Sequence, residues 1–230
     1  PQAARGGNGG SDDGPKPYAE VITAEAETDT GLFDVHRIGD ELFYEIPMDR
    51  MGEEFLLLSR VARTPDGAGY GGSKTNTSIV RWQHRGDRVL LRLVGHENVA
   101  DTTLPVAEAV RNSNFEPVIM AFDIEALSPD SSAAVIEVTP LFMEDVPLLG
   151  LQSFRRTQYG VRRVDGDRTF VDWARSFPTN VEVRRVLTYE ATQAPSNAAS
   201  NTVSMEMPRS PKILVIAART PGRFSTRIRR

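Results

Sequence analysis

The chain has 230 residues, of which 40% are hydrophobic and 25% are charged, a composition that is ordinary for a folded domain. A chain of this length can bury a sizeable core without stabilising cross-links such as disulfides or bound metal ions. The absence of cysteine excludes disulfides, thiolate metal sites and cysteine nucleophiles. The net charge of −4 argues against a nucleic-acid partner. No apolar run approaches the roughly 18 residues of a membrane span, so we expect none.

The first part of the chain changes from leader to strand. Residues 1–17 are glycine, proline and small polar residues, which predict a flexible leader. Residues 32–37 and 42–46 alternate on either side of Gly39-Asp40, a pattern typical of a β-hairpin. Phe55–Val61 predicts a further strand, which we expect to be buried on both faces.

A glycine-rich loop is predicted over Thr64–Ser78. Its Gly67–Thr75 stretch is similar to a phosphate-binding loop, but Ser73 stands where that motif needs glycine. A strand rather than a helix is expected after it, so we predict no phosphate site. Ile79–Trp82 and Val89–Val94 then predict a second hairpin.

The middle of the chain contains the best helix candidate, Thr102–Asn112, where a threonine can cap the start and Pro105 suits the first turn. Pro117–Ile124 and Ala133–Val138 predict a pair of strands. Phe142–Leu149 is expected to form one helical turn.

A third hairpin is predicted from Tyr159–Arg163 and Thr169–Val171, which flank a Gly-Asp pair. Val171–Arg175 could open a helix instead. Val181–Tyr189 and Thr202–Met207 are rich in β-branched residues or alternate, and they predict two more strands.

Many short strands in hairpins and few helices predict a mainly β fold, α+β at most. We expect an antiparallel sheet or sandwich built from hairpins, with one or two short helices. The β-rich domain is expected over residues 18–207. Residues 208–230 are predicted to be a basic tail or a truncated connector, because five arginines and no acid lie between Ala217 and Arg230.

The three histidines, His36, His84 and His96, show no paired spacing that would place two imidazoles on one zinc ion. His36 and His84 could meet across a sheet, although a lone histidine on a strand is more often structural. The sequence therefore predicts no catalytic, metal-binding or cofactor-binding residue in this chain.

Acidic residues give a second candidate site. Asp123 and Glu125 would share one face of a strand, and Glu137 could oppose them on the partner strand. Such a cluster could do acid–base work or hold calcium. Acids on an exposed sheet face are also common, so both interpretations stay open.

Aromatic residues give a third candidate. Tyr44, Tyr70 and Trp82 could form an exposed strip that contacts a peptide or glycan ligand. The alternative is that these side chains alternate into the core.

A set of short segments carries a family resemblance. They are Lys16-Pro17-Tyr18, Val21-Ile22, Gly31-Leu32-Phe33, Phe43-Tyr44-Glu45-Ile46-Pro47, Leu57-Leu58-Ser59-Arg60, Val80-Arg81-Trp82, Asn112-Ser113-Asn114-Phe115-Glu116-Pro117, Ala121-Phe122-Asp123-Ile124, Asp145-Val146-Pro147, Ser176-Phe177-Pro178-Thr179-Asn180-Val181-Glu182-Val183-Arg184 and Val186-Leu187-Thr188-Tyr189. In this order they resemble the N-terminal domain of unknown function of large, exported bacterial zinc-dependent metalloproteases. The similarity covers roughly residues 16–207.

The resemblance implies a non-catalytic accessory domain, because in that family a later domain carries the His-Glu-x-x-His helix and the zinc. The expected partner is a peptidase domain in the same full-length protein, whose site this domain would support or shape, together with a peptide substrate. It also implies an exported protein, periplasmic or extracellular. Two alternatives remain: a standalone β-rich module for peptide, glycan or self-assembly into a homo-oligomer, and an autonomous hydrolase that uses carboxylates.

Overall fold

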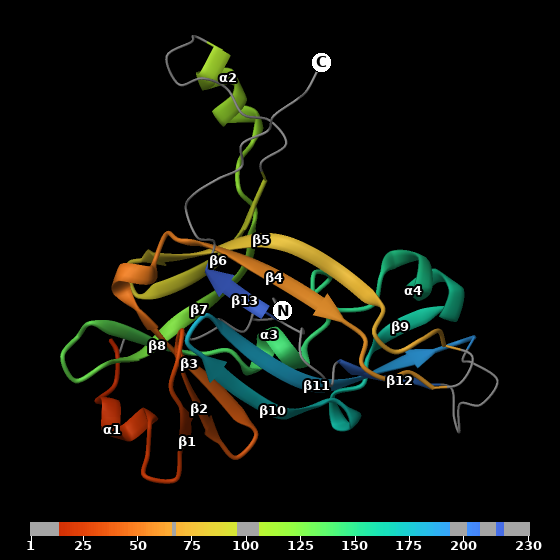
Figure 1. Ribbon diagram of the computed structural model, residues 1–230, viewed down its shortest axis with the longest axis horizontal. Coiled ribbons are helices and arrows are strands. Elements are labelled where there is room, and N and C mark those ends of the chain that lie inside the picture. Colours follow the sequence, from red (N-terminus) through yellow and green to blue (C-terminus); the bar gives the residue numbers. More distant parts are fainter. Residues whose placement is uncertain (1–13, 66–67, 96–105, 194–201, 208–214, 219–230) are drawn as a thin grey trace, which may run out of the picture.

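Figure 1 shows the computed structural model, which describes residues 14–65, 68–95, 106–193, 202–207 and 215–218. The strands are β1 (Glu27–Asp29), β2 (Asp34–Ile38), β3 (Glu41–Pro47), β4 (Glu54–Arg60), β5 (Lys74–Arg85), β6 (Arg88–Val94), β7 (Val118–Leu127), β8 (Ala133–Glu137), β9 (Val161–Val164), β10 (Phe170–Phe177), β11 (Asn180–Ala191), β12 (Thr202–Met207) and β13 (Val215–Ala218). The helices are α1 (Tyr18–Val21), α2 (Val106–Ser113), α3 (Thr139–Met143) and α4 (Ser153–Tyr159), with 3-10 turns η1 (Met48–Arg50) and η2 (Gly166–Arg168).

The predicted mainly β, antiparallel fold class is confirmed. The strands pair in the order β1-β2-β3-β8-β7-β6-β5-β4-β13-β11-β10, while β9 and β12 join β11. Every pair of named strands is antiparallel. The helices in the described part of the chain are short, and none is both long and apolar enough to cross a membrane.

The long sheet curls until its two ends approach each other. The Leu32 amide donates to the Phe177 carbonyl at 2.8 Å, and Ser176 Oγ donates to the Phe33 carbonyl at 2.6 Å. A Cβ on Gly31 would lie 2.7 Å from the Phe177 backbone, so only glycine permits this approach. No ladder joins β2 to β10 among the described residues, so the sheet remains open rather than a barrel.

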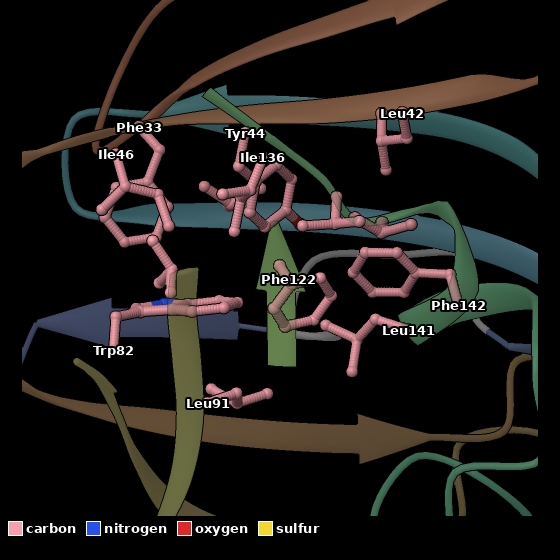
Figure 2. Packing of buried hydrophobic residues seen from close by; sticks show 14 of the residues in the cluster. Phe33, Leu42, Tyr44, Ile46, Trp82, Leu91, Phe122, Ile136, Leu141 and Phe142 are labelled. Atoms are coloured by element: carbon pink, nitrogen blue, oxygen red, sulfur yellow. The ribbon is translucent and has the colours of Figure 1, made fainter. Parts of the chain in front are cut away.

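The main core fills the inside of this curl (Figure 2). Trp82 lies at its centre, with ring centroids 6.5 Å from Tyr44 and 5.7 Å from Phe122. Helix α3 supplies Leu141 and Phe142, both fully buried. Truncating one buried aromatic of this kind to alanine typically costs about 3–5 kcal/mol, so these rings hold the curled sheet together.

A second, smaller core lies under α4. It is formed by Val61, Ala68, Leu151, Tyr159, Leu187, Tyr189, Ala191, Val203 and Met205. These residues come from the β4–β5 loop, from α4 and the segment before it, and from β11 and β12. The second core therefore fixes α4 against the loop that follows β4.

A buried arginine ties the segment between α3 and α4 to β11. Arg185 on β11 donates from Nη1 to the Phe142 carbonyl and from Nη2 to the Leu149 carbonyl, the latter at 2.6 Å. Burial lowers the pKa of Arg185 to about 10, which leaves it charged at neutral pH. The segment between α3 and α4 is thereby tied to the sheet.

Two predicted hairpins are confirmed. β2 and β3 pair around Gly39, and β5 and β6 pair around Gly86, each glycine having a positive φ, 61° and 63°. The predicted pairing of Pro117–Ile124 with Ala133–Val138 is confirmed as β7 with β8. The two strands predicted last correspond to β11 and β12.

The prediction of a third hairpin is wrong. β9 and β10 do not pair with each other, because both pair with β11, β9 at Tyr189–Ala191 and β10 at Asn180–Val186. The alternative of a helix at Val171–Arg175 is also wrong, since β10 runs through it. Tyr159 ends α4, a helix that the sequence analysis missed because strand-like residues follow it.

Several boundaries differ from those predicted. Phe55–Val61 is not buried on both faces, because β4 alternates and Leu56 is 39% exposed. The predicted loop Thr64–Ser78 ends early, since β5 begins at Lys74. The helical turn expected at Phe142–Leu149 begins earlier, as α3.

The ends of the β-rich domain also differ. β13 lies in the segment assigned to the tail, yet it pairs with β4 and β11 and so extends the sheet past Met207. Within the predicted helix Thr102–Asn112, the described part from Val106 is helical as α2, whereas its proposed caps lie outside the described residues. Residues 1–13 of the predicted leader and 219–230 of the tail also lie outside them.

Candidate functional site

His36 and His84 are not brought together. His36 is buried on β2, and His84 is exposed on β5, with β3, β8, β7 and β6 between the two strands. His96 lies outside the described residues. Within the described ranges, no group of three or more histidine, aspartate or glutamate side chains could hold a metal ion.

His36 belongs to a polar network that ties α1 and β1 to β2 and β3. Its Nδ1 lies 2.8 Å from Thr28 Oγ1, and its Nε2 lies 3.1 Å from Glu45 Oε2. The Tyr18 hydroxyl donates to the same carboxylate oxygen at 2.8 Å. The hydrogen bond from His36, helped by the one from Tyr18, lowers the pKa of Glu45 despite its partial burial. Each member has a partner inside the network, so we assign it a structural role.

The acidic residues predicted to form a cluster do lie together, at one hollow of the surface. Asp123, Glu125 and Glu137 line a hollow of about 350 Å³ together with Glu144. Two of these acids are already paired across strands: Arg88 Nε donates to Asp123 at 2.8 Å, and Lys16 Nζ lies 3.6 Å from Glu125. The arrangement is that of a charged sheet face, and nothing at it points to a bound ligand.

The predicted aromatic strip does not form. Tyr44 and Trp82 are fully buried in the main core, which is the alternative that the sequence left open (Figure 2). Tyr70 is 86% exposed, in the loop between β4 and β5. Of the three aromatics, Tyr70 alone remains available to a ligand.

Tyr70 lies at a hollow of about 190 Å³ beside α4, which we call the Tyr70 hollow. Figure 1 shows α4 beyond the end of β5 and next to β9. The lining residues are Val61, Thr64, Ala68, Gly69, Tyr70, Ser73, Lys74, Thr75, Leu151, Gln152, Phe154, Arg155 and Met205. Its floor is buried apolar surface of the second core, while Phe154, 59% exposed, stands with Tyr70 at its outer side.

Arg155 is held in a defined position at this hollow. Its Nη1 donates to Gln158 Oε1 at 2.9 Å and to the Tyr159 hydroxyl at 3.4 Å. Its guanidinium lies over the Phe154 ring, 5.1 Å from the centroid. A Cβ at Gly69 would lie 3.3 Å from Nη2, so the loop passes close to the charge. A half-buried guanidinium is thus fixed by neutral groups.

A second hollow of about 460 Å³ adjoins the first and shares Thr75, Leu151 and Gln152 with it. Gln152 Nε2 donates to the Thr75 carbonyl at 2.7 Å, so the residue before α4 is tied to β5 where the two hollows meet. Asp145 and Arg156 line the second hollow as a two-point ion pair. This pair raises the pKa of Arg156, because the hydrogen bonds from the guanidinium to Asp145 favour its charged form.

Sequence reasoning missed Phe154 and Arg155. They lie on a helix that was not predicted, some eighty residues from the loop that they contact. Phe154 next to two arginines is the only local signal, and by itself it indicates an exposed helix as readily as a binding surface.

Two family models match the chain. One, described as Domain of unknown function (DUF5117), matches residues 72–214, which is more than half of the chain. The other, described as Domain of unknown function (DUF5118), matches residues 15–64. No curated protein and no solved structure matches. The boundary between the two matches falls in the loop from β4 to β5, which are neighbouring strands of one sheet.

Proposed function

The chain belongs to the family described as Domain of unknown function (DUF5117), and from this premise we propose that it is a non-catalytic accessory domain of a zinc-dependent metalloprotease. It packs against a peptidase domain of the same protein and supports or shapes that domain's site. The zinc and its His-Glu-x-x-His helix belong to the peptidase domain. The whole protein is exported, to the periplasm or beyond the cell.

The first support is the resemblance, and one of its segments lies at a projecting feature of the fold. Asn112–Pro117 begins in the last turn of helix α2 and leads into β7. Figure 1 shows α2 standing clear of the curled sheet, at the end of the connection between β6 and β7. A helix held away from its own domain is suited to contact another one.

The observation that carries the proposal is the exposed apolar surface at the base of α2. Phe115 is 75% exposed and Val118 is 44% exposed. Both residues lie in the short stretch that leads from α2 into β7, and apolar surface exposed on such a projecting segment is suited to a contact with another protein. We therefore assign Phe115 and Val118 to the interface with the peptidase domain.

The base of α2 is fixed to the sheet, so this surface is ordered before any contact. Arg92 lies 5.3 Å from the centroid of the Phe115 ring and donates from Nη1 to the Glu116 carbonyl at 2.7 Å. Arg81 donates to both carboxylate oxygens of Glu116, at 2.7 and 2.8 Å. A preordered surface loses less conformational entropy on binding.

The test continues the reading frame beyond this chain and expresses the following segment separately. We expect that segment to contain His-Glu-x-x-His and to bind this chain in a calorimetric titration. Phe115→Ser should weaken the binding about tenfold or more, as loss of an interface aromatic does. Phe170→Ser, at another exposed phenylalanine on β10, is the matched control and should change nothing. A frame without the zinc motif, or equal loss in both variants, would count against the proposal.

A standalone binding module is the second candidate, and the Tyr70 hollow is the observation that favours it. Its test is the oligomeric state by light scattering, with peptide and glycan arrays on the 230-residue chain. A monomer that binds no peptide or glycan would exclude it. An autonomous carboxylate hydrolase has less support, because Asp123 and Glu125 are already paired with Arg88 and Lys16.

A further inference from the structure

We propose that the Tyr70 hollow binds an extended peptide segment through an acidic side chain of that segment. The inference goes beyond the proposed function and does not depend on it, since the residues that carry it all lie in the described part of this chain. A peptidase domain could be absent and the hollow would still bind.

The charge of the hollow is the first argument. Lys74 and Arg155 line it, and its described lining residues include no aspartate or glutamate. Neither cation has a carboxylate partner among the described residues: Arg155 is bonded to a glutamine and a tyrosine, and Lys74 is exposed. The whole chain has a net charge of −4, so this local excess of positive charge opposes the average of the molecule. A ligand carboxylate would complete the arrangement.

The geometry of Arg155 is the second argument. Its Nη1 is used by Gln158 and Tyr159, and its face is covered by Phe154. The remaining donors of the guanidinium are left for an acceptor from outside, in a position that needs no reordering. Guanidinium groups bind carboxylates through two parallel hydrogen bonds. A guanidinium that is already held in one orientation loses less conformational entropy when it forms them.

Shape and apolar surface indicate a peptide as the occupant. The hollow of about 190 Å³ has room for one or two side chains, less than the roughly 300–1,000 Å³ of sites for drug-sized ligands. Tyr70 and Phe154 at its outer side, over a floor of Leu151 and Met205, offer contacts to an apolar neighbour of the acidic residue.

The adjoining hollow extends the surface beyond one residue. It shares Thr75, Leu151 and Gln152 with the Tyr70 hollow, and Gln152 donates to the Thr75 carbonyl where the two hollows meet. The hydroxyl Oγ1 of Thr75, at the boundary of both hollows, is buried and has no hydrogen-bond partner in the described part of the chain. Asp145 is neutralised by Arg156, so it does not repel an acidic segment. A segment of several residues can therefore lie across both hollows.

The experiment measures fluorescence anisotropy with two labelled, end-blocked peptides, Ala-Glu-Leu-Glu-Ala and Ala-Gln-Leu-Gln-Ala, on the full 230-residue chain. We expect the acidic peptide to bind about tenfold or more tightly than its neutral counterpart at low salt. This difference should shrink as salt is raised, because one partner of each ion pair is near solvent.

Variants assign the binding to the hollow. Arg155→Gln should remove most of the preference for the acidic peptide, and Lys74→Gln a smaller part of it. Arg85→Gln changes an exposed arginine at the far end of β5 and should leave the preference intact. Tyr70→Ser should weaken both peptides without changing the melting temperature, because Tyr70 is exposed and supports no core.

Three results would overturn the inference. Equal affinity for the two peptides would remove the role of the carboxylate. If no binding is detected up to about 1 mM peptide, the hollow is not a peptide site, since a dissociation constant above this concentration is too weak for specific recognition. Displacement of the peptide by an equal concentration of inorganic phosphate would indicate a small-anion site instead.

Discussion

Glu45 shows how a single ionisable side chain is controlled by its neighbours. Hydrogen bonds from His36 and Tyr18 hold the pKa of Glu45 below its ordinary value of 4.5. A carboxyl group with a lowered folded-state pKa stabilises the fold above its ordinary pKa. That stability is lost as the pH falls from 4.5 through the lower folded-state value.

Glu45→Gln should therefore cost about 1.5–3 kcal/mol at neutral pH, the range for hydrogen bonds to a charged group. The difference between variant and wild type should become smaller at an acidic pH below the lowered folded-state pKa of Glu45, where this carboxyl is protonated in the folded and the unfolded protein. Urea unfolding at the two pH values measures this. A difference that is the same at both would show that the network does not act through the charge of Glu45.

The aromatic residues show the limit of sequence reasoning at this scale. Tyr44, Tyr70 and Trp82 are all aromatic, and each is flanked in the sequence by both polar and apolar residues. Two of them are buried in the core and one is exposed. Tyr44 and Trp82 lie on strand faces that meet the core, whereas Tyr70 lies in a loop, and residue type alone carries no information on either placement.

At the scale of elements, Arg185 connects β11 to the segment between α3 and α4. Arg185→Leu should destabilise the protein by about 2–4 kcal/mol, because the carbonyls of Phe142 and Leu149 lose their donors. Relief of the buried charge offsets part of this cost. Arg162→Leu, at an exposed arginine on β9, is the control and should change stability by less than about 0.5 kcal/mol. Urea unfolding decides it, and equal effects of the two variants would contradict a structural role for Arg185.

Turn residues and alternating patterns predicted correctly those hairpins whose strands are neighbours in the sequence. The hairpins around Gly39 and Gly86 were predictable because the turn and both strands are contiguous in the sequence. The predicted pairing of β9 with β10 was wrong because β11, later in the chain, pairs with both strands. Competition of this kind between local and distant partners is not encoded in the alternation of residues.

At the scale of the whole molecule, the two family matches lie in one sheet. β3, within residues 15–64, pairs with β8, and β4 pairs with β5 and β13. Phe33 and Phe55 share the main core with Trp82. The two matched regions are thus parts of one folded unit rather than separate domains.

We therefore expect neither residues 15–64 nor residues 72–230 to fold alone, whereas the whole chain unfolds in a single transition. Amide proton dispersion in NMR spectra of each fragment, alone and mixed, measures this. Well-dispersed spectra from the isolated longer fragment would contradict a shared core.

The candidate site belongs to this largest scale as well. The mainly β class could be predicted from composition and turn spacing, and Tyr70 was named as a candidate ligand contact. The hollow beside it could not be predicted, because it joins the β4–β5 loop to α4 through a core assembled from β11 and β12. Such a site exists only once the strand order is established.

The central claim is that this chain is the non-catalytic accessory domain of a zinc peptidase. The most direct test measures zinc by mass spectrometry, per polypeptide, in the product of the complete reading frame and in the 230-residue chain side by side. We predict one tightly bound zinc ion in the complete product and none in this chain. A stoichiometric zinc ion in the 230-residue chain itself, or none in the complete product, would contradict the account.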